Sequence, residues 1–461
     1  MSEQEQGTFR DRHSSITEEG KRNWSYALKP KGKLYQYRSW LSYFYLLLFF
    51  SLPFIKVDGN PMFQFNFPEG EFIFFSTLFT PQDFIMFGIG MLIFILFIII
   101  FTLIYGRIFC GWVCPQTIFM EMVFRKIEYF IEGDGNKQRI NNKKAWTTEL
   151  YIRKTIKHIV FLALSFAISN TFLSYIIGVD ALYKIITEPV SEHIVGFVAI
   201  FFFTMAFYVV YAFVREIVCT VICPYGRLQG VLLDKNSIIV AYNYLRGEPR
   251  NKKQKEAGAG DCIDCGMCVN VCPTNIDIRN GTQLECVNCT ACIDACNMMM
   301  KNVGKAPELI TFASENSIAS GKKFEFTYRI KSYTAVLGVL MVLLTVLILT
   351  RTTFDSTIMR VPGQSIQENA DGTISNLYRI KVTNKSNKAL PYHLLATDPN
   401  VKIERIGIPL DSLKGRQLAE ETFFIKVFPK NIHQRKMKYE IKLMSGNKVM
   451  ETKSATFISE F

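Results

Sequence analysis

Histidine is scarce in this sequence, with five among 461 residues. A membrane haem held by two histidines needs both of them at matched depth. His158 precedes one apolar run and His193 precedes the next, so the topology argued below places them on opposite membrane faces. We therefore expect no haem. His158 would share a face with two cysteine pairs, but an interfacial surface histidine explains it more simply.

Cysteine is absent from the last third of the chain, because all twelve cysteines lie at or before Cys296. Disulfides therefore do not staple that region. No acidic pair, Ser/His/Asp set or glycine-rich phosphate loop stands out there either. Short runs of alternating apolar and polar residues, separated by turn residues, predict an antiparallel immunoglobulin-like sandwich of about 100 residues.

Positive charge is nearly absent from two loops between apolar runs, where only Lys56 and Lys184 occur. A bilayer core needs about 20 apolar helical residues, and five runs qualify: 39–55, 84–105, 159–178, 194–214 and 335–350. Lys and Arg crowd the N-terminus, the loop after the second run and the stretch 322–331. By the positive-inside rule these parts are cytoplasmic, and the segment beyond Thr350 is exported.

Most of the net charge of +13 is thus explained by the basic residues of the parts that we expect to be cytoplasmic. Since the basic residues flank apolar runs and form no separate basic domain, we expect no nucleic-acid partner. The first forty residues are polar, without the short apolar core of a signal peptide. We expect residues 1–38 to be weakly ordered.

Eight cysteines gather in one stretch that contains two C-x2-C-x2-C-x3-C runs in tandem, which is typical of a two-cluster ferredoxin. In such runs the first three cysteines hold one four-iron cluster, and the fourth crosses to the other. This rule predicts two ligand sets: Cys262, Cys265, Cys268 and Cys296 for one [4Fe-4S] cluster, and Cys286, Cys289, Cys292 and Cys272 for the other. Zinc sites and disulfides are the alternatives, but they rarely use a repeated string of this kind.

The other four cysteines form two C-x3-C-P motifs, Cys110 and Cys114 before Pro115, and Cys219 and Cys223 before Pro224. Cysteines four apart on a helix face the same way. The duplication predicts a pseudo-repeat that delivers one thiol pair from each half to the cytoplasmic membrane edge. Copper(I), zinc or iron–sulfur could bind there, or the thiols could be redox-active dithiols. Buried structural cysteine is the plainer reading, which the duplication disfavours.

Residues 116–131 alternate apolar and charged side chains at helical spacing. This pattern predicts an amphipathic helix on the membrane surface. The loop 56–83 is rich in phenylalanine, including Phe63, Phe65, Phe67 and Phe75, and we expect it to lie on the outer membrane face.

The predicted fold class is a multi-domain membrane protein: an α-helical bundle of five transmembrane helices with an inserted two-cluster ferredoxin-like domain and a C-terminal immunoglobulin-like β-sandwich. The expected parts are a cytoplasmic segment (1–38), a four-helix transmembrane region with both C-x3-C-P motifs (39–233), a cytoplasmic ferredoxin-like domain with linkers (234–331), a fifth membrane helix (332–351) and an exported sandwich (352–461).

In this order of motifs the chain resembles the FixG/CcoG family of cytochrome oxidase accessory proteins, over nearly its whole length. The resemblance implies a bacterial inner-membrane protein that helps to mature a cbb(3)-type haem–copper oxidase by reducing copper(II) to copper(I), a cupric reductase activity. It implies cluster ligands at the eight cysteines and copper-handling or redox roles for Cys110, Cys114, Cys219 and Cys223. Asn297 departs from the proline that follows the other run, which puts the surroundings of one cluster in doubt.

The expected partners are membrane lipid, copper ions, oxidase subunits or copper chaperones and transporters, and a cytoplasmic electron donor. A homo-oligomer of this chain stays open, as does the identity of the donor. Two other functions stay open at this point. One is a quinol-linked electron relay of the NapH/NosR type that serves a periplasmic reductase. The other is a non-redox assembly scaffold.

Overall fold

The computed structural model describes residues 14–16, 19, 21–57, 60–66, 71–74, 77–79, 83–145, 147–250, 258–321, 325–361, 366–369, 371–386, 388–407, 411–415 and 417–459. They form two compact units. The first unit comprises residues 1–51, 91–174 and 180–341, and the second comprises 52–90, 175–179 and 342–461. All twelve cysteines belong to the first unit.

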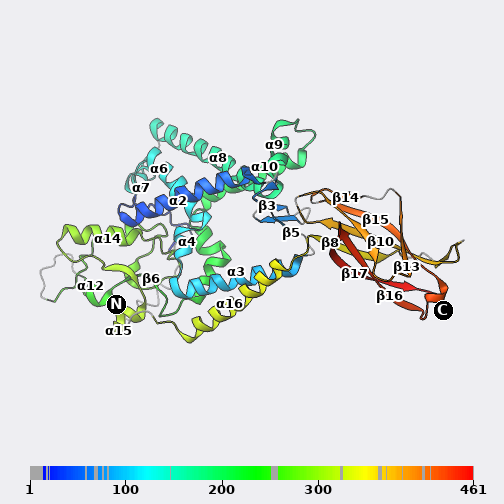
Figure 1. Ribbon diagram of the computed structural model, residues 1–461. Coiled ribbons are helices and arrows are strands. Elements are labelled where there is room, and N and C mark those ends of the chain that lie inside the picture. The colour runs from blue at the N-terminus through cyan, green and yellow to red at the C-terminus, as the bar shows by residue number, and fades with distance from the viewer. Residues whose placement is uncertain are drawn as a thin grey trace. The chain divides into compact units, whose positions relative to one another are not determined.

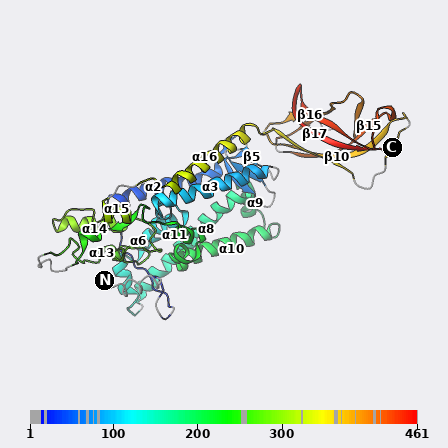
Figure 2. The same cartoon turned by 90° about the horizontal axis from the view of Figure 1, so that it is seen from below.

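Four described helices are long and apolar enough to cross a membrane: α3 (Phe84–Tyr105), α8 (Thr148–Ile177), α10 with its π-helical continuation η4 (Ile194–Val209 and Val210–Val214), and α16 (Tyr328–Leu349). In both views α3 and α16 run side by side (Figures 1 and 2). These helices fall on four of the five predicted spans.

The remaining predicted span, 39–55, falls on α2 (Lys33–Ser51) and the 3-10 turn η1 (Leu52–Phe54). This helix is not among the four that are apolar enough, although it exposes large apolar side chains such as Trp40, at 73%, and Leu47, at 66%. The count of five spans therefore stays a prediction.

Short helices carry the chain through the C-x3-C-P motifs and the second loop: α4 (Ile108–Trp112), α5 (Pro115–Thr117), π-helical η3 (Ile118–Phe124), α6 (Arg125–Ile131), α7 (Gly135–Asn141), α9 (Val179–Thr187), η5 (Val218–Ile222) and α11 (Pro224–Leu232). The predicted helix over 116–131 is present, but its surface position is wrong. Phe119 and Phe124 are buried on one side, and Arg125 and Glu128 are buried as ion pairs on the other.

The ferredoxin region consists of β6 (Ile239–Tyr242), α12 (Tyr244–Gly247), α13 (Met267–Asn270), η6 (Ile278–Asn280), α14 (Ala291–Asn302), β7 (Ile310–Ala313) and α15 (Glu315–Ser320). Strands β6 and β7 pair antiparallel, with Ile239 opposite Ala313. The buried residues of this region include Val240, Ile293 and Met300, and they pack around the cysteine runs.

Residues 21–35 are ordered against the ferredoxin region, so the expected weak order is wrong for them; residues 1–13, 17, 18 and 20 lie outside the described part. The amide of Leu28 donates to the carbonyl of Asn270 at 2.8 Å. The amide of Tyr35, at the start of α2, donates to the carboxylate of Asp294 at 2.8 Å. Asp294 thereby caps a helix from outside it, where a negative charge stabilises the helix dipole.

The loop before α3 forms small sheets, and its position on the outer membrane face stays a prediction. They are built from β1 (Lys56–Val57), β2 (Asn60–Pro61), β3 (Phe63–Asn66), β4 (Glu71–Phe74) and β5 (Thr77–Phe79), in the orders β1-β2 and β3-β4-β5. Cross-strand aromatic contacts such as Phe65 with Phe74, 5.3 Å between ring centroids, stabilise the three-stranded sheet. Phe67 and Phe75 lie outside the described residues.

The described residues of the C-terminal sandwich form ten antiparallel strands: β8 (Phe354–Arg360), β9 (Gln367–Glu368), β10 (Ile374–Asn384), β11 (Leu390–Pro391), β12 (His393–Ala396), β13 (Val401–Ile406), β14 (Ser412–Leu413), β15 (Leu418–Val427), β16 (Lys436–Ser445) and β17 (Lys448–Ile458). One sheet has the order β13-β15-β10-β8 with β9 paired to β10, another β12-β16-β17, and β11 pairs with β14. A short 3-10 turn, η7 (Pro429–Asn431), follows β15.

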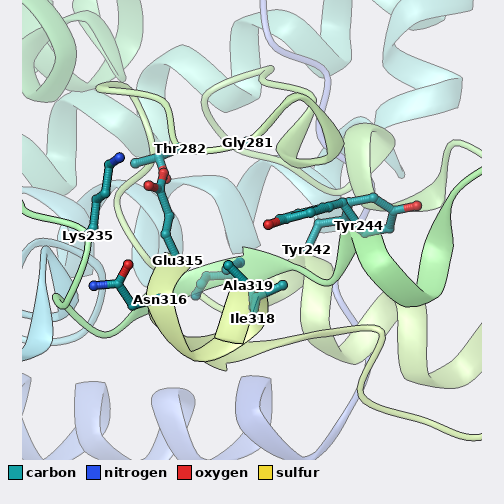
Figure 3. Close-up of a pocket in the computed structure, with 11 residues that line it drawn as sticks. Lys235, Tyr242, Tyr244, Gly281, Thr282, Glu315, Asn316, Ile318 and Ala319 are labelled. Carbon is teal, nitrogen blue, oxygen red and sulfur yellow. The ribbon is translucent and has the colours of Figure 1, made fainter. Parts of the chain in front are cut away.

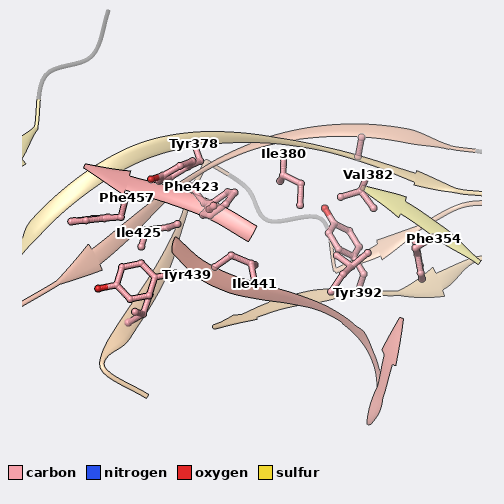
Figure 4. Close-up of a cluster of buried hydrophobic side chains, with 14 of the residues drawn as sticks. Phe354, Tyr378, Ile380, Val382, Tyr392, Phe423, Ile425, Tyr439, Ile441 and Phe457 are labelled. Carbon is pink, nitrogen blue, oxygen red and sulfur yellow. The ribbon is translucent and has the colours of Figure 1, made fainter. Parts of the chain in front are cut away.

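Alternate residues of these strands fill one core between the sheets (Figure 4). Phe423, from the middle of β15, is fully buried and stacks on Tyr378 of β10 with ring centroids 5.7 Å apart. The predicted alternation is therefore confirmed as a buried face and a solvent face on each long strand.

Candidate metal and thiol centre

The first three cysteines of one run and the fourth of the other line a common hollow, which we call the first cysteine cage: Cys262, Cys265, Cys268 and Cys296. Cys268 lies on α13 and Cys296 lies inside α14. Tyr242 and Arg279 complete the wall. Two carboxylates, Asp277 at 2.7 Å and Asp264, hold the Arg279 guanidinium in place.

The complementary four cysteines line a neighbouring hollow, which Cys268 of the first cage also borders. We call these four the second cysteine cage: Cys272, Cys286, Cys289 and Cys292. The fold therefore brings together the two sets that the crossover rule predicts. Their role as ligands remains a prediction.

The backbone of both runs has the same unusual shape. Asp264 and Gly266, two and four residues after Cys262, have φ of 47° and 68°, and Asn288 and Thr290 have φ of 53° and 66° at the equivalent places after Cys286. Alternation of right- and left-handed residues turns successive N–H groups toward one concave side, a shape that suits anionic groups such as iron–sulfur clusters.

The donor set was tested against a single zinc ion in each cage. Tetrahedral zinc with Zn–S bonds of about 2.3 Å holds its sulfurs about 3.8 Å apart. Among the described residues, only Glu188, Glu192 and His193 place three ligand atoms within 4.8 Å of one another. No three cysteine sulfurs come that close, so the cages fit a larger group such as a four-iron cube.

The cage thiols are also poor anions without a metal. Burial raises the pKa of Cys286 to about 12 and that of Cys289 to about 11. A bound cluster supplies the positive charge that keeps such sulfurs deprotonated.

Asn297 stands where the other run has Pro273. Its side-chain oxygen accepts a 2.7 Å hydrogen bond from the amide of Glu308. Because no proline interrupts it, α14 continues past Cys296 to Asn302. Asparagine in place of proline therefore lengthens the helix after Cys296, and Cys296 remains in the first cysteine cage.

The two C-x3-C-P motifs repeat each other in backbone detail. Cys114 and Cys223 are each the N-cap of a helix whose first residue is the motif's proline. Their amides donate to the carbonyls of Phe109 and Val218, five residues back, at 2.9 and 2.7 Å. The residue four before the first cysteine has φ of 57° in both halves, Gly106 in one and Arg215 in the other.

This register aligns Arg215 with Gly106 and Glu216 with Arg107. Arg215 tolerates a left-handed backbone because both terminal nitrogens of its guanidinium bind the buried Glu128 carboxylate, at 2.8 and 3.3 Å.

The four cysteines of these motifs, here called the thiol quartet (Cys110, Cys114, Cys219 and Cys223), lie near one another in the first unit. Burial, with smaller contributions from the charges of other quartet thiols, raises the pKa of Cys110 to about 11 and that of Cys219 to about 12. No three of these sulfurs lie within 4.8 Å of one another, so the quartet is not a closed four-coordinate site.

Polar side chains hold individual thiols of the quartet. The Cys110 thiol donates to the side-chain oxygen of Gln229 at 2.8 Å. Gln229 is fully buried and donates in turn to Thr102 at 3.1 Å and Tyr225 at 2.8 Å. The hydroxyl of Thr117 lies 3.9 Å from the Cys219 sulfur.

The thiol quartet adjoins the second cysteine cage. A Cβ atom at Gly111 would lie 2.4 Å from the carbonyl oxygen of Val287, so α4 packs its backbone directly on the loop between Cys286 and Cys289. Glycine is needed there for this close approach.

Two buried arginines, Arg38 and Arg107, lie near the contact of Gly111 with Val287. Arg38 donates to the carbonyl of Gly111 at 2.7 Å, and its charge acts on Cys289. Arg107 donates to the carbonyl of Cys219 at 3.4 Å and to that of Leu284, and its charge acts on both Cys110 and Cys286. Sequence reasoning missed Arg38, Gln229 and Asp294, since nothing in a local pattern marks a partner 70 or more positions away.

The Nδ1 atom of His158 and the hydroxyl of Tyr208 form a 3.0 Å hydrogen bond, and the His158 ring stacks on Phe213. Aromatic residues of α10 and η4 thus contact the His158 ring, one by a hydrogen bond and one by stacking.

The fold and these cages together define a class: an iron–sulfur electron-transfer protein with apolar helices typical of a membrane protein and a C-terminal immunoglobulin-like domain. Family models support each part. A 4Fe-4S dicluster domain matches residues 214–315, a 4Fe-4S binding domain matches 87–131, and the Ig-like fold at the C-terminal of FixG matches 344–460.

The chain belongs to the FixG family. It is 32% identical to protein RdxA of Cereibacter sphaeroides over 374 residues, which is 77% of this chain and 78% of RdxA. Protein RdxB of the same organism is 31% identical over 392 residues, 80% of this chain and 81% of RdxB. The nitrogen fixation protein FixG of Rhizobium meliloti is 35% identical over 262 residues, 54% of this chain and 48% of FixG.

Proposed function

We propose that this protein reduces copper(II) to copper(I) at the thiol quartet, with electrons supplied through two [4Fe-4S] clusters, for insertion into a cbb(3)-type cytochrome c oxidase. The observation that carries the proposal is the backbone contact of Gly111 with Val287. Gly111 directly follows the quartet residue Cys110, so the quartet adjoins the ligand loop of the second cysteine cage.

Copper is the substrate in this scheme. Thiolates favour copper(I) over copper(II), so a pair of thiols both attracts the ion and favours its reduced form. Each electron from a reduced cluster converts one copper(II) to one copper(I), and no atom is transferred. Since the quartet does not close around one ion, we expect two sulfurs to hold copper(I).

The scheme also assigns sides. We propose five membrane spans including α2, with the N-terminus and ferredoxin region in the cytoplasm and the sandwich in the periplasm of a bacterial inner membrane. The partners are then lipid, a cytoplasmic electron donor, and oxidase subunits or copper carriers that meet the protein.

The test uses the full chain, purified without oxygen in detergent and carrying about eight irons. Reduced protein is mixed with copper(II), while cluster absorbance and copper(I) chelation are followed. We expect cluster oxidation and copper(I) formation in equal amounts. Alanine at all four positions, Cys110, Cys114, Cys219 and Cys223, should abolish both while iron content is retained.

Ile222→Ala is the matched control, because Ile222 lies within the second motif and is 60% exposed. It should reduce copper at the normal rate. Normal reduction by the four-alanine variant would refute the site, and eight irons with no response to copper would refute the function in favour of a quinol-linked relay.

A further inference from the structure

A cavity of about 310 Å³ lies between β6 and α15 in the first unit. Lys235 and Glu315 approach it from one side and the rings of Tyr242 and Tyr244 from the other (Figure 3). We call it the β6 cavity. Its size is at the lower end of small-molecule sites, which run from about 300 to 1,000 Å³.

The β6 cavity shares walls with both cysteine cages. Val240 lines this cavity and the second cage, and Tyr242 lines this cavity and the first cage. The two residues alternate along β6 and are buried, with 1% and 5% exposure. A molecule in the β6 cavity would therefore be one side chain away from each cage.

Some polar side chains of the cavity already have hydrogen-bond partners within the described part of the chain, and others do not. The hydroxyl of Thr282 donates to Glu315 at 3.1 Å, and the amide of Asn316 donates to Asn236 at 2.6 Å. The exposed amine of Lys235 has no hydrogen-bond partner among the residues that the structure describes. It is free to bind an anionic group at the rim.

Aromatic rings on one side of a cavity and a cation at its opposite rim suit a flat, polar-edged ring that carries an anion at one end. Among redox molecules this describes flavin mononucleotide better than a quinol, whose isoprenoid tail needs apolar walls. Two one-electron centres beside one cavity also match the chemistry of a two-electron donor.

We propose that the β6 cavity is the electron-entry site and binds a flavin hydroquinone. One flavin hydroquinone is oxidised to flavin, gives one electron toward each cysteine cage and releases two protons to solvent. This inference rests on the proposed electron-transfer function, since it names the donor to the same two clusters, but it does not depend on copper.

The first experiment measures binding alone. Oxidised flavin mononucleotide is titrated into the full, cluster-loaded chain, and quenching of its fluorescence is recorded. Ala319 lines the cavity and is exposed, so Ala319→Trp should fill it and weaken binding at least tenfold. Ser320→Trp adds the same ring at the next, non-lining position of α15 and should bind as the unaltered protein does.

The second experiment measures electron entry by stopped flow. Cluster bleaching by reduced flavin mononucleotide should saturate with concentration, and Ala319→Trp should slow it at least tenfold. Dithionite should reduce both variants fully, which shows that the clusters are intact. Equal flavin binding and equal bleaching in Ala319→Trp would overturn the proposal.

A parallel run replaces flavin with a water-soluble quinol. Saturable reduction by quinol but not by flavin would overturn the flavin assignment. Failure of the copper assay with normal flavin-driven bleaching would refute the copper function and leave this inference standing.

Discussion

At the scale of single residues, Arg38 and Arg107 distinguish the second cysteine cage from the first. Arg38 is 3% exposed and Arg107 is 2% exposed, and they lie beside Cys289 and Cys286. By contrast, the Arg279 guanidinium at the first cage is neutralised by two aspartates. Positive charge in a dry site stabilises an added electron, so the second cage should hold the cluster of higher potential.

Arg38→Gln should therefore lower the midpoint potential of one cluster by roughly 60 mV, which corresponds to a tenfold change in a one-electron equilibrium. Arg38→Lys should keep most of the potential because it keeps the charge. A redox titration followed by electron paramagnetic resonance measures both. An equal shift of the two clusters would contradict a local effect of this charge.

Gly111 provides the second prediction at this scale. Gly111→Ala places a methyl group 2.4 Å from the Val287 carbonyl, and such overpacking costs about 1–3 kcal/mol. We expect a lower unfolding temperature of the first unit and slower copper-driven cluster oxidation at normal iron content. Gly88→Ala is the control, since an added Cβ there meets nothing within 4 Å. Equal behaviour of the two variants would mean that the contact is unimportant.

At the scale of elements, ion pairs join the two halves of the pseudo-repeat. Arg215, just before η5, binds Glu128 on α6, which also pairs with Lys157 of α8 at 3.5 Å. Burial alone would raise the pKa of Glu128, but the charges of Arg215 and Lys157 outweigh it and lower the pKa to about 2.

A lowered carboxyl pKa gives stability that is complete above the unfolded value, about 4.5, and is lost as pH falls toward 2. Glu128→Gln should destabilise the first unit by about 3 kcal/mol at neutral pH, because it leaves buried positive charge unpaired. The loss should shrink between pH 4.5 and lower values. Unfolding followed by circular dichroism over this range checks the sign, and a difference that grows on acidification would disprove it.

The sequence patterns predicted some of these elements and missed others. Spacing alone grouped the cysteines, and period-two alternation found the long strands β10 and β15, because both are local signals. The positive φ of Arg215 could not be predicted, since its side chain is held by Glu128, which is 87 positions away. Likewise β8 was missed, because its pairing with β10 is what makes Phe354 a core residue.

At the scale of the whole molecule, the two units are stabilised by different means. The first contains two cysteine cages whose buried thiols need positive charge, and the second has a continuous apolar core drawn from strands β8 to β17. Iron should therefore matter to only one of them.

Removal of iron with a chelator at neutral pH under oxidising conditions should unfold much of the ferredoxin region and leave the sandwich folded. The fragment 352–461, made alone, should fold cooperatively without disulfides. Near-ultraviolet circular dichroism, which reports the packed Tyr378 and Phe423 rings, tests both outcomes. Loss of that signal together with the iron would show that the units are coupled.

The cap on α2 also sets an order of assembly. The capping acceptor is the carboxylate of Asp294, which lies between Cys292 and Cys296. It leaves the ribosome about 260 residues after Leu34, whose amide donates to it. The N-terminus of α2 therefore stays uncapped until the segment around Asp294 is made and is ordered by the iron–sulfur cluster. In a cell short of iron, chains would therefore carry an uncapped first helix, which a protease could recognise before the faulty protein is used.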